Sequence, residues 1–171
     1  MDVLPPNVPG TYALHLRLSH PIERDVGRLG RFHFPEGEYI YVGSAFGPGG
    51  LHARVGRHLY HRGKHHWHID YLLPSARLVG FWASTLPAHL ECRWVMALIT
   101  LPGASIPARG LGASDCLRSC PAHLLAFSGF DQQVISERLE QTMHAVANGE
   151  HLQEYQMIRA ILPAQGASHM R

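Results

Sequence analysis

Residues 39–61 read YIYVGSAFGPGGLHARVGRHLYH and contain the clearest local patterns in the chain. Aromatic and β-branched residues fill its first four positions, which predicts a strand. Residues 43–50 are too rich in glycine and proline to continue that strand, so they predict a tight connection. After it, Leu51, Val55 and Leu59 recur every four positions, which predicts a helix with one buried face. A strand, a glycine-rich connection and a helix therefore follow one another directly.

Apolar segments on both sides of this stretch predict further strands. Residues 11–18 (TYALHLRL) and 77–84 (RLVGFWAS) have strand patterns, and residues 31–42 contain a glycine-bearing turn that predicts a hairpin. Residues 67–73 (WHIDYLL) are short and aromatic, so they fit either a strand or a buried helix. We expect this segment to lie in the core, with Asp70 held by hydrogen bonds.

The second half of the chain is predicted to be mainly helical. Residues 87–101 and 131–148 have apolar positions at helical spacing, and a shorter helix is expected near residues 152–162. The fold class expected is α/β of the α+β type: a small mixed or antiparallel three-stranded central sheet plus an extra hairpin, flanked by helices. Residues 1–130 would form the main domain, and residues 131–171 a helical C-terminal extension and tail.

The net charge of +2 conceals a segregated distribution. Between residues 39 and 90, five basic residues face one acid, and six of the 14 histidines fall within residues 52–68. Residues 131–154 carry five acids against one arginine. A basic first half suits a polyanionic partner, whereas the acidic segment is expected to be a solvated helix face.

Two classes of protein are not expected from this sequence. The longest uncharged apolar run, residues 95–108, is interrupted by Pro102 and Pro107 and is too short to cross a membrane. The first residues lack the basic and apolar regions of a secretory signal. Three cysteines do not make a full disulfide framework. We therefore expect a cytoplasmic protein with no membrane partner, whose thiols are free or bound to metal.

The cysteines offer a candidate metal site. Cys92, Cys116, Cys120 and His123 are four soft ligands, which is the number that a tetrahedral Zn²⁺ ion takes. The alternative is that the cysteines are buried and free, since free cysteine is among the most buried residue types. A structural Zn²⁺ is thus one of two interpretations.

Four features resemble the GIY-YIG nuclease superfamily when taken in order. They are residues 10–12 (GTY), residues 41–43 (YVG), residues 54–58 (RVGRH) and the acidic Glu91. The chain is more similar still to the Uri-type endonuclease branch, which shares the GSAFG, WHIDYLL and SDC…HL segments. The resemblance covers roughly residues 10–127, so it makes residues 1–130 a GIY-YIG-like nuclease domain.

This resemblance implies a divalent-metal-dependent endonuclease that hydrolyses phosphodiester bonds in DNA, with branched, damaged or single-stranded DNA as candidate substrates. Tyr41 would be the general base and Tyr12 would orient it. Arg54 would clamp the scissile phosphate, and His58 would bond the phosphate or shuttle a proton. Glu91 would hold a single Mg²⁺ (or Mn²⁺) ion.

DNA is the expected partner, and protein partners are unknown. Backbone amides of residues 43–50, at the start of a helix, are candidates for a phosphate cradle. The candidate nucleic-acid-binding residues are Gly43, Ser44, Arg57, Arg62, Lys64 and His68.

The chain also departs from the superfamily pattern. The usual lysine near the second tripeptide is missing, no asparagine follows Glu91, and the gap between Tyr12 and Tyr41 is long. Ser114 or Asp115 are the candidates to replace the asparagine. These departures keep an alternative open, a nucleic-acid-binding module of the same fold with lost or weak cleavage.

Overall fold

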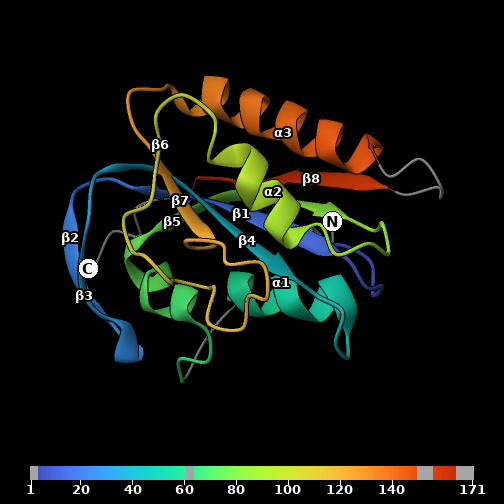
Figure 1. Cartoon of the computed structure of the whole chain (residues 1–171), viewed down its shortest axis with the longest axis horizontal. Helices are drawn as coiled ribbons and strands as arrows, with labels where there is room; N and C mark the ends of the chain where they lie inside the picture. Colours follow the sequence, from blue (N-terminus) through green and yellow to red (C-terminus); the bar gives the residue numbers. More distant parts are fainter. Residues whose placement is uncertain (1–3, 61–63, 150–155, 165–171) are drawn as a thin grey trace, which may run out of the picture.

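The computed structural model describes residues 4–60, 64–149 and 156–164, which are built around one antiparallel sheet (Figure 1). Its six strands lie in the order β6-β7-β4-β1-β5-β8. They are β1 (Thr11–Leu18), β4 (Gly37–Ser44), β5 (Arg77–Ser84), β6 (Ala104–Ser105), β7 (Leu124–Phe127) and β8 (Met157–Ile161). The α+β fold class is therefore confirmed. The sheet has six strands instead of three, and the three expected strands β4, β1 and β5 are its centre.

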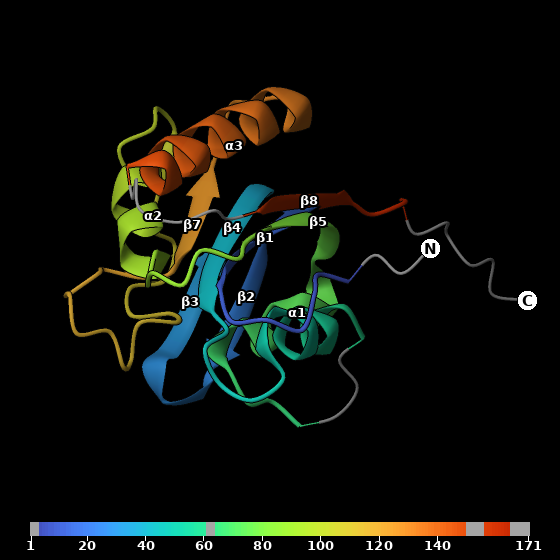
Figure 2. The same ribbon diagram turned by 90° about the vertical axis from the view of Figure 1, so that its right-hand side faces the viewer.

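Helices cover both faces of this sheet (Figure 2). Helix α1 (Gly50–Tyr60) lies on one face, together with two short 3₁₀ helices, η2 (His68–Tyr71) and η3 (Leu73–Ser75). Helices α2 (Glu91–Leu98) and α3 (Gln132–Asn148) lie on the other. The segment WHIDYLL thus forms 3₁₀ turns instead of a strand.

The alternation of side chains along β1 builds two separate cores. Tyr12 and Leu14 pack on the face of α1 with Leu51, whereas Ala13 belongs to the core that contains Trp94 of α2. Residues of β4 divide in the same way. Because both faces are covered, the central strands are buried along nearly their whole length.

The expected hairpin over residues 31–42 is wrong in its pairing. Strand β3 (Gly30–Phe34) pairs with β2 (Ile22–Val26) in a separate two-stranded sheet, and a 3₁₀ turn (Gly27–Leu29) joins them. Strand β4 is not available to β3, because its two edges already pair with β1 and β7.

The helix expected over residues 87–101 is shorter in the structure, since α2 begins only at Glu91. The backbone N–H of Leu90 donates to Thr11 Oγ1 on β1, 3.3 Å away. This bond fastens the start of α2 to the first residue of the strand that carries Tyr12. It therefore places Glu91 near that strand.

The C-terminal region is only partly helical. Helix α3 is confirmed, but residues 157–161 form β8, which pairs with β5, where a second helix was expected. Residues 152–155 of that expected helix lie outside the described part of the chain. Strand β8 forms because β5 offers an open edge, which local sequence does not reveal. Helix α3 packs in the same core as α2, and β8 extends the central sheet. Helix α3 and strand β8 therefore both complete the main fold.

Within residues 4–60, 64–149 and 156–164, no helix combines the length and the apolar character needed to cross a bilayer.

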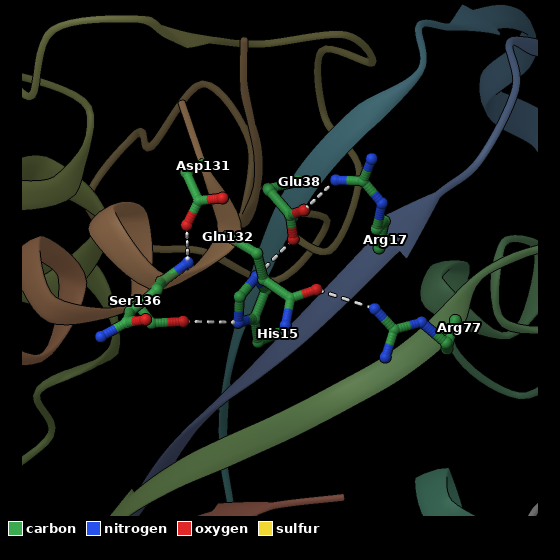
Figure 3. A network of polar contacts seen from close by, with 8 residues as sticks. His15, Arg17, Glu38, Arg77, Asp131, Gln132 and Ser136 are labelled. Atoms are coloured by element: carbon green, nitrogen blue, oxygen red, sulfur yellow. Dashed lines mark hydrogen bonds and ion pairs between the residues drawn. The ribbon is translucent and has the colours of Figure 1, made fainter. Parts of the chain in front are cut away.

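A buried polar network ties α3 to the sheet (Figure 3). The carboxylate of Glu38, which is 1% exposed, accepts hydrogen bonds from Arg17 and from His15 Nε2, the latter at 2.6 Å. The other ring nitrogen of His15 meets Ser136 Oγ of α3 at 3.2 Å. Burial alone would raise the pKa of Glu38, but the hydrogen bonds from His15 and Arg17 outweigh it and hold that pKa below its ordinary value.

Replacing Glu38 by glutamine is expected to lower the free energy of unfolding by about 2 kcal/mol at neutral pH, less than for a fully buried pair because Arg17 regains water. A carboxylate with a lowered pKa stabilises the fold above its ordinary pKa, and this stabilisation is lost as pH falls through the lowered value. The gap between wild type and Glu38→Gln should therefore close in acid. Denaturant unfolding at neutral and acidic pH measures it, with exposed Glu36→Gln as control; a gap that does not change with pH would refute the assignment.

Candidate active site and metal centre

Tyr12 and Tyr41 come from the neighbouring strands β1 and β4 and lie on the α1 side of the sheet. Their exposed fractions are 1% and 5%. Gly43 stands opposite Tyr12, and a Cβ atom at this glycine would come within 2.4 Å of the Tyr12 hydroxyl. The glycine of the second tripeptide is therefore needed to make room for the tyrosine of the first.

His58 of α1 joins the two tyrosines. Its Nε2 lies 2.8 Å from the hydroxyl of Tyr12, and its ring centroid lies 6.1 Å from that of Tyr41. Behind it, Nδ1 of His58 lies 4.0 Å from Oδ1 of Asp70, a carboxylate with 0% exposure. The expected hydrogen bonds of Asp70 are confirmed, because its Oδ2 accepts the backbone N–H groups of His66 and Trp67 at 2.8 and 3.0 Å.

Arg54 stands on the same helix as His58, four residues earlier. Its guanidinium lies over the ring of Trp67, 4.4 Å from the centroid, and Arg57 contacts the same ring at 4.8 Å. This contact holds the half-buried Arg54 by cation–π attraction. The charge of Arg54 acts on both Tyr12 and Tyr41, lowering the pKa of each.

Burial nevertheless decides the protonation of the two tyrosines. It raises the pKa of Tyr12 well above its ordinary value, and the neighbouring Tyr41 raises it further. The pKa of Tyr41 is raised first by burial and then by the charge of Glu91. Arg54 opposes both shifts without reversing them, so the protein alone holds two neutral phenols at neutral pH.

Glu91 is the first residue of α2, and its charge acts on both tyrosines. Its side chain is 24% exposed, and Oε1 lies 2.8 Å from Nδ1 of His123. All five predicted catalytic residues therefore interact at one place. They arrive there from β1, β4, α1 and α2.

A pocket of about 210 Å³ opens beside Tyr41. Ser114 and Asp115, the two candidates to replace the missing asparagine, line this pocket. The charge of Asp115 also raises the pKa of Tyr41, after the effects of burial and Glu91. The other lining residues are His66, Trp67, His68 and Gly112.

The predicted nucleic-acid-binding residues divide between this pocket and its surroundings. His68 lines the pocket, and its Nδ1 accepts the N–H of Gly112 at 3.1 Å. Arg57 contacts the buried Asp70 at 3.5 Å and the backbone oxygen of the exposed Lys64 at 3.2 Å. Arg62 lies outside the described residues.

The glycine-rich connection is packed against the N-terminal segment. The N–H of Ala45 donates to Gly10 and that of Gly50 donates to Gly47, at 2.8 and 3.2 Å. These two amides are therefore not available for the expected phosphate cradle of residues 43–50. Ser44 is half-buried, and Gly43 serves to admit Tyr12.

The predicted metal ligands come together in space. One ligand atom each from Cys92, Cys116, Cys120 and His123 lies within 4.8 Å of the others. The Sγ atoms of Cys92 and Cys116 are 3.4 Å apart. Ser119 has a φ of 57°, a left-handed turn that bends the chain between the last two cysteines. This Cys₃His cluster can hold a metal ion.

Two partners of the catalytic candidates were not identified from the sequence. One is Asp70 behind His58, which was expected only to pack in the core. The other is His123, which was considered only as a metal ligand, although it also contacts Glu91. The signal for the second was available, because the predicted metal ligand Cys92 directly follows Glu91.

Comparison with known proteins identifies the family. A search of curated proteins and a search of solved structures found no match. The family described as "Domain of unknown function DUF123" matches residues 11–148. This range runs from the first residue of β1 to the last residue of α3, and it includes the tyrosines, α1, Glu91 and the Cys₃His cluster. The chain belongs to the DUF123 family.

Proposed function

We propose that the protein is a divalent-metal-dependent endonuclease that hydrolyses phosphodiester bonds in DNA. One observation carries the proposal: Tyr12, Tyr41, Arg54, His58 and Glu91 act on one another at one place, beside a pocket. Each of these residues alone has an ordinary structural explanation. Their convergence supports a site that can bind and attack a phosphate.

Each side chain has a role that fits its position. Arg54 is charged at all relevant pH values. Its planar guanidinium can donate two parallel hydrogen bonds to the oxygens of a phosphate. His58, held between Tyr12 and Asp70, can pass a proton to or from the phosphate. Tyr41 lines the pocket, so it is the candidate to take a proton from the attacking water.

The carboxylates fit a hard divalent cation. Glu91 and Asp115 both act on Tyr41, and carboxylate oxygens are the ligands that Mg²⁺ and Mn²⁺ prefer. Such an ion would supply positive charge that lowers the pKa of Tyr41 and stabilises the charge that develops on the phosphate. Asp115 would then supply the oxygen ligand that the missing asparagine would provide.

The motifs that carry the GIY-YIG resemblance lie within or just ahead of the range matched by the DUF123 family. We propose that the two describe one relationship, in which this chain is a Uri-type member of the nuclease superfamily. The extra residues between Tyr12 and Tyr41 support this proposal. They form the separate β2–β3 hairpin and leave the pairing of β1 with β4 intact.

We also propose Zn²⁺ as the ion of the Cys₃His cluster. Three thiolates and one imidazole are a common tetrahedral zinc set, whereas Mg²⁺ prefers oxygen. The protein would then hold two different metals, each selected by its ligands.

A second function is favoured by a specific observation. Burial keeps both tyrosines protonated, and the lysine typical of the superfamily is missing. A protein of this fold with such a site can bind nucleic acid without cutting it. Binding and cleavage must therefore be measured together.

The test combines plasmid nicking with filter binding in the presence of Mg²⁺ or EDTA. Wild type is expected to nick DNA only with Mg²⁺, and Glu91→Gln to be slower by about 10²-fold or more. Exposed Glu36→Gln is the matched control and should cut like wild type. If wild type binds linear, branched and single-stranded DNA yet cuts none of them, the endonuclease is rejected and the binding module remains.

A further inference from the structure

We infer that a metal ion in the Cys₃His cluster positions Glu91 through His123, so that this cluster and the active site form one linked unit. The part of this inference that concerns Glu91 in catalysis rests on the proposed function. The link between Glu91, His123 and the metal stands on geometry alone. His123 is the residue that the two groups share.

The ring of His123 stands between the two centres, since it contacts Glu91 and also offers a ligand atom to the Cys₃His cluster. Nδ1 lies 2.8 Å from Oε1 of Glu91, and the imidazole is 2% exposed. A carboxylate accepts hydrogen bonds, so this contact places the proton of a neutral imidazole on Nδ1 and leaves the lone pair on Nε2. Nε2 is buried and makes no hydrogen bond of normal geometry among the described residues, although the ring interacts with the thiol of Cys116 in the cluster.

The cluster can supply the partner that this imidazole nitrogen lacks. A buried polar atom without a partner is costly, and here the three cysteines stand within 4.8 Å of the histidine. A metal ion bound by the thiolates and Nε2 would satisfy that nitrogen. The result is a carboxylate–histidine–metal chain, in which the carboxylate orients the ring and makes it a stronger ligand.

The same metal would also restrain Glu91 through its backbone. Cys92 follows Glu91 in the first turn of α2, so a metal bound to Cys92 also restrains the backbone of Glu91. His123 is itself fixed by its backbone, since its N–H donates to Leu111 and its carbonyl accepts from Val42, at 2.8 and 2.9 Å.

The cluster also borders the catalytic tyrosine. A Cβ atom on Gly112 would lie 2.8 Å from the ring of Tyr41 and 3.0 Å from Cβ of His123. One glycine thus separates the proposed general base from the proposed metal ligand. His123 contacts Oε1 of Glu91, so Oε2 would be left to bind the active-site cation.

The test uses Co²⁺ as a spectroscopic probe of the cluster in the reduced full-length protein. Wild type is expected to show the thiolate charge-transfer and ligand-field absorption of tetrahedral Co²⁺, displaced by Zn²⁺. Glu91→Gln and Glu91→Asp should keep these bands but bind Co²⁺ about 10- to 100-fold more weakly, because the partner of His123 is weakened or withdrawn. Glu36→Gln is the control and should bind like wild type.

The inference is overturned if wild type shows no such bands, or if both Glu91 variants bind Co²⁺ with wild-type affinity. Its failure is separable from that of the proposed function. Weaker Co²⁺ binding by both variants, in a protein that cuts no DNA, supports the link and rejects the nuclease. For an active protein, Cys120→Ser should raise the Mg²⁺ concentration needed for half-maximal cleavage several-fold, and an unchanged Mg²⁺ requirement would overturn the positioning of Glu91.

Discussion

Replacing Arg54 by alanine is expected to slow DNA cleavage by about 10²- to 10³-fold, the range found when one donor to a developing oxyanion is removed. Arg54 lies over the ring of Trp67 and acts on both tyrosines, so its loss removes a positive charge that opposes the raised pKa of the proposed base. Arg54→Lys should recover only part of the rate, because lysine keeps the charge but lacks the planar fork.

Single-turnover cleavage at saturating DNA measures this effect on the chemical step. The matched control is Arg28→Ala, which removes an exposed arginine in the turn between β2 and β3. Circular dichroism should show both variants folded, since Arg54 is only half-buried. Cleavage by Arg54→Ala at the wild-type rate would remove this residue from the site.

Replacing Tyr41 by phenylalanine is expected to reduce cleavage by about 10²- to 10⁴-fold, the usual contribution of a general base. The fold should be kept, because the ring still packs between the sheet and α1. The pH dependence carries the sharper test. Burial raises the pKa of Tyr41, so only a small fraction of this tyrosine is deprotonated at neutral pH. That fraction increases with pH, and the wild-type rate should therefore increase above neutral pH.

The rate of Tyr41→Phe should lose that increase. Cleavage is measured for both proteins across pH at fixed Mg²⁺, with Tyr60→Phe as the control because Tyr60 is 63% exposed. A variant that cuts at the wild-type rate with the wild-type pH profile would exclude Tyr41 as the base.

Much of the fold could be predicted from local patterns. Strands β1 and β5 and helix α1 have the periodicity of their elements, and the structure confirms them. Strands β6 and β8 could not be predicted, because β6 has two residues and β8 is determined by the open edge of β5. The predicted pairing of β3 with β4 was wrong for the same reason, since it depends on which strands already occupy the edges of β4.

The candidate site shows the same division. Tyr12, Tyr41, Arg54 and Glu91 could be selected from ordered motifs, and the Cys₃His set from residue types alone. The contact of His123 with Glu91 was missed, because 32 positions separate them in the chain and the one signal for it, a shared metal with Cys92 directly after Glu91, is indirect. The loss of two amides from the expected phosphate cradle could not be foreseen, because the hydrogen-bond partners of Ala45 and Gly50 depend on how the connection packs against the N-terminal segment.

The most direct test of the nuclease site is a crystal structure of Tyr41→Phe with a DNA oligonucleotide and Mn²⁺, with anomalous data collected at the manganese edge. We expect one DNA phosphate within hydrogen-bond distance of Arg54. We also expect an anomalous peak for a manganese ion bound to the carboxylate of Glu91. DNA bound to another face, with neither phosphate nor manganese at these residues, would contradict it.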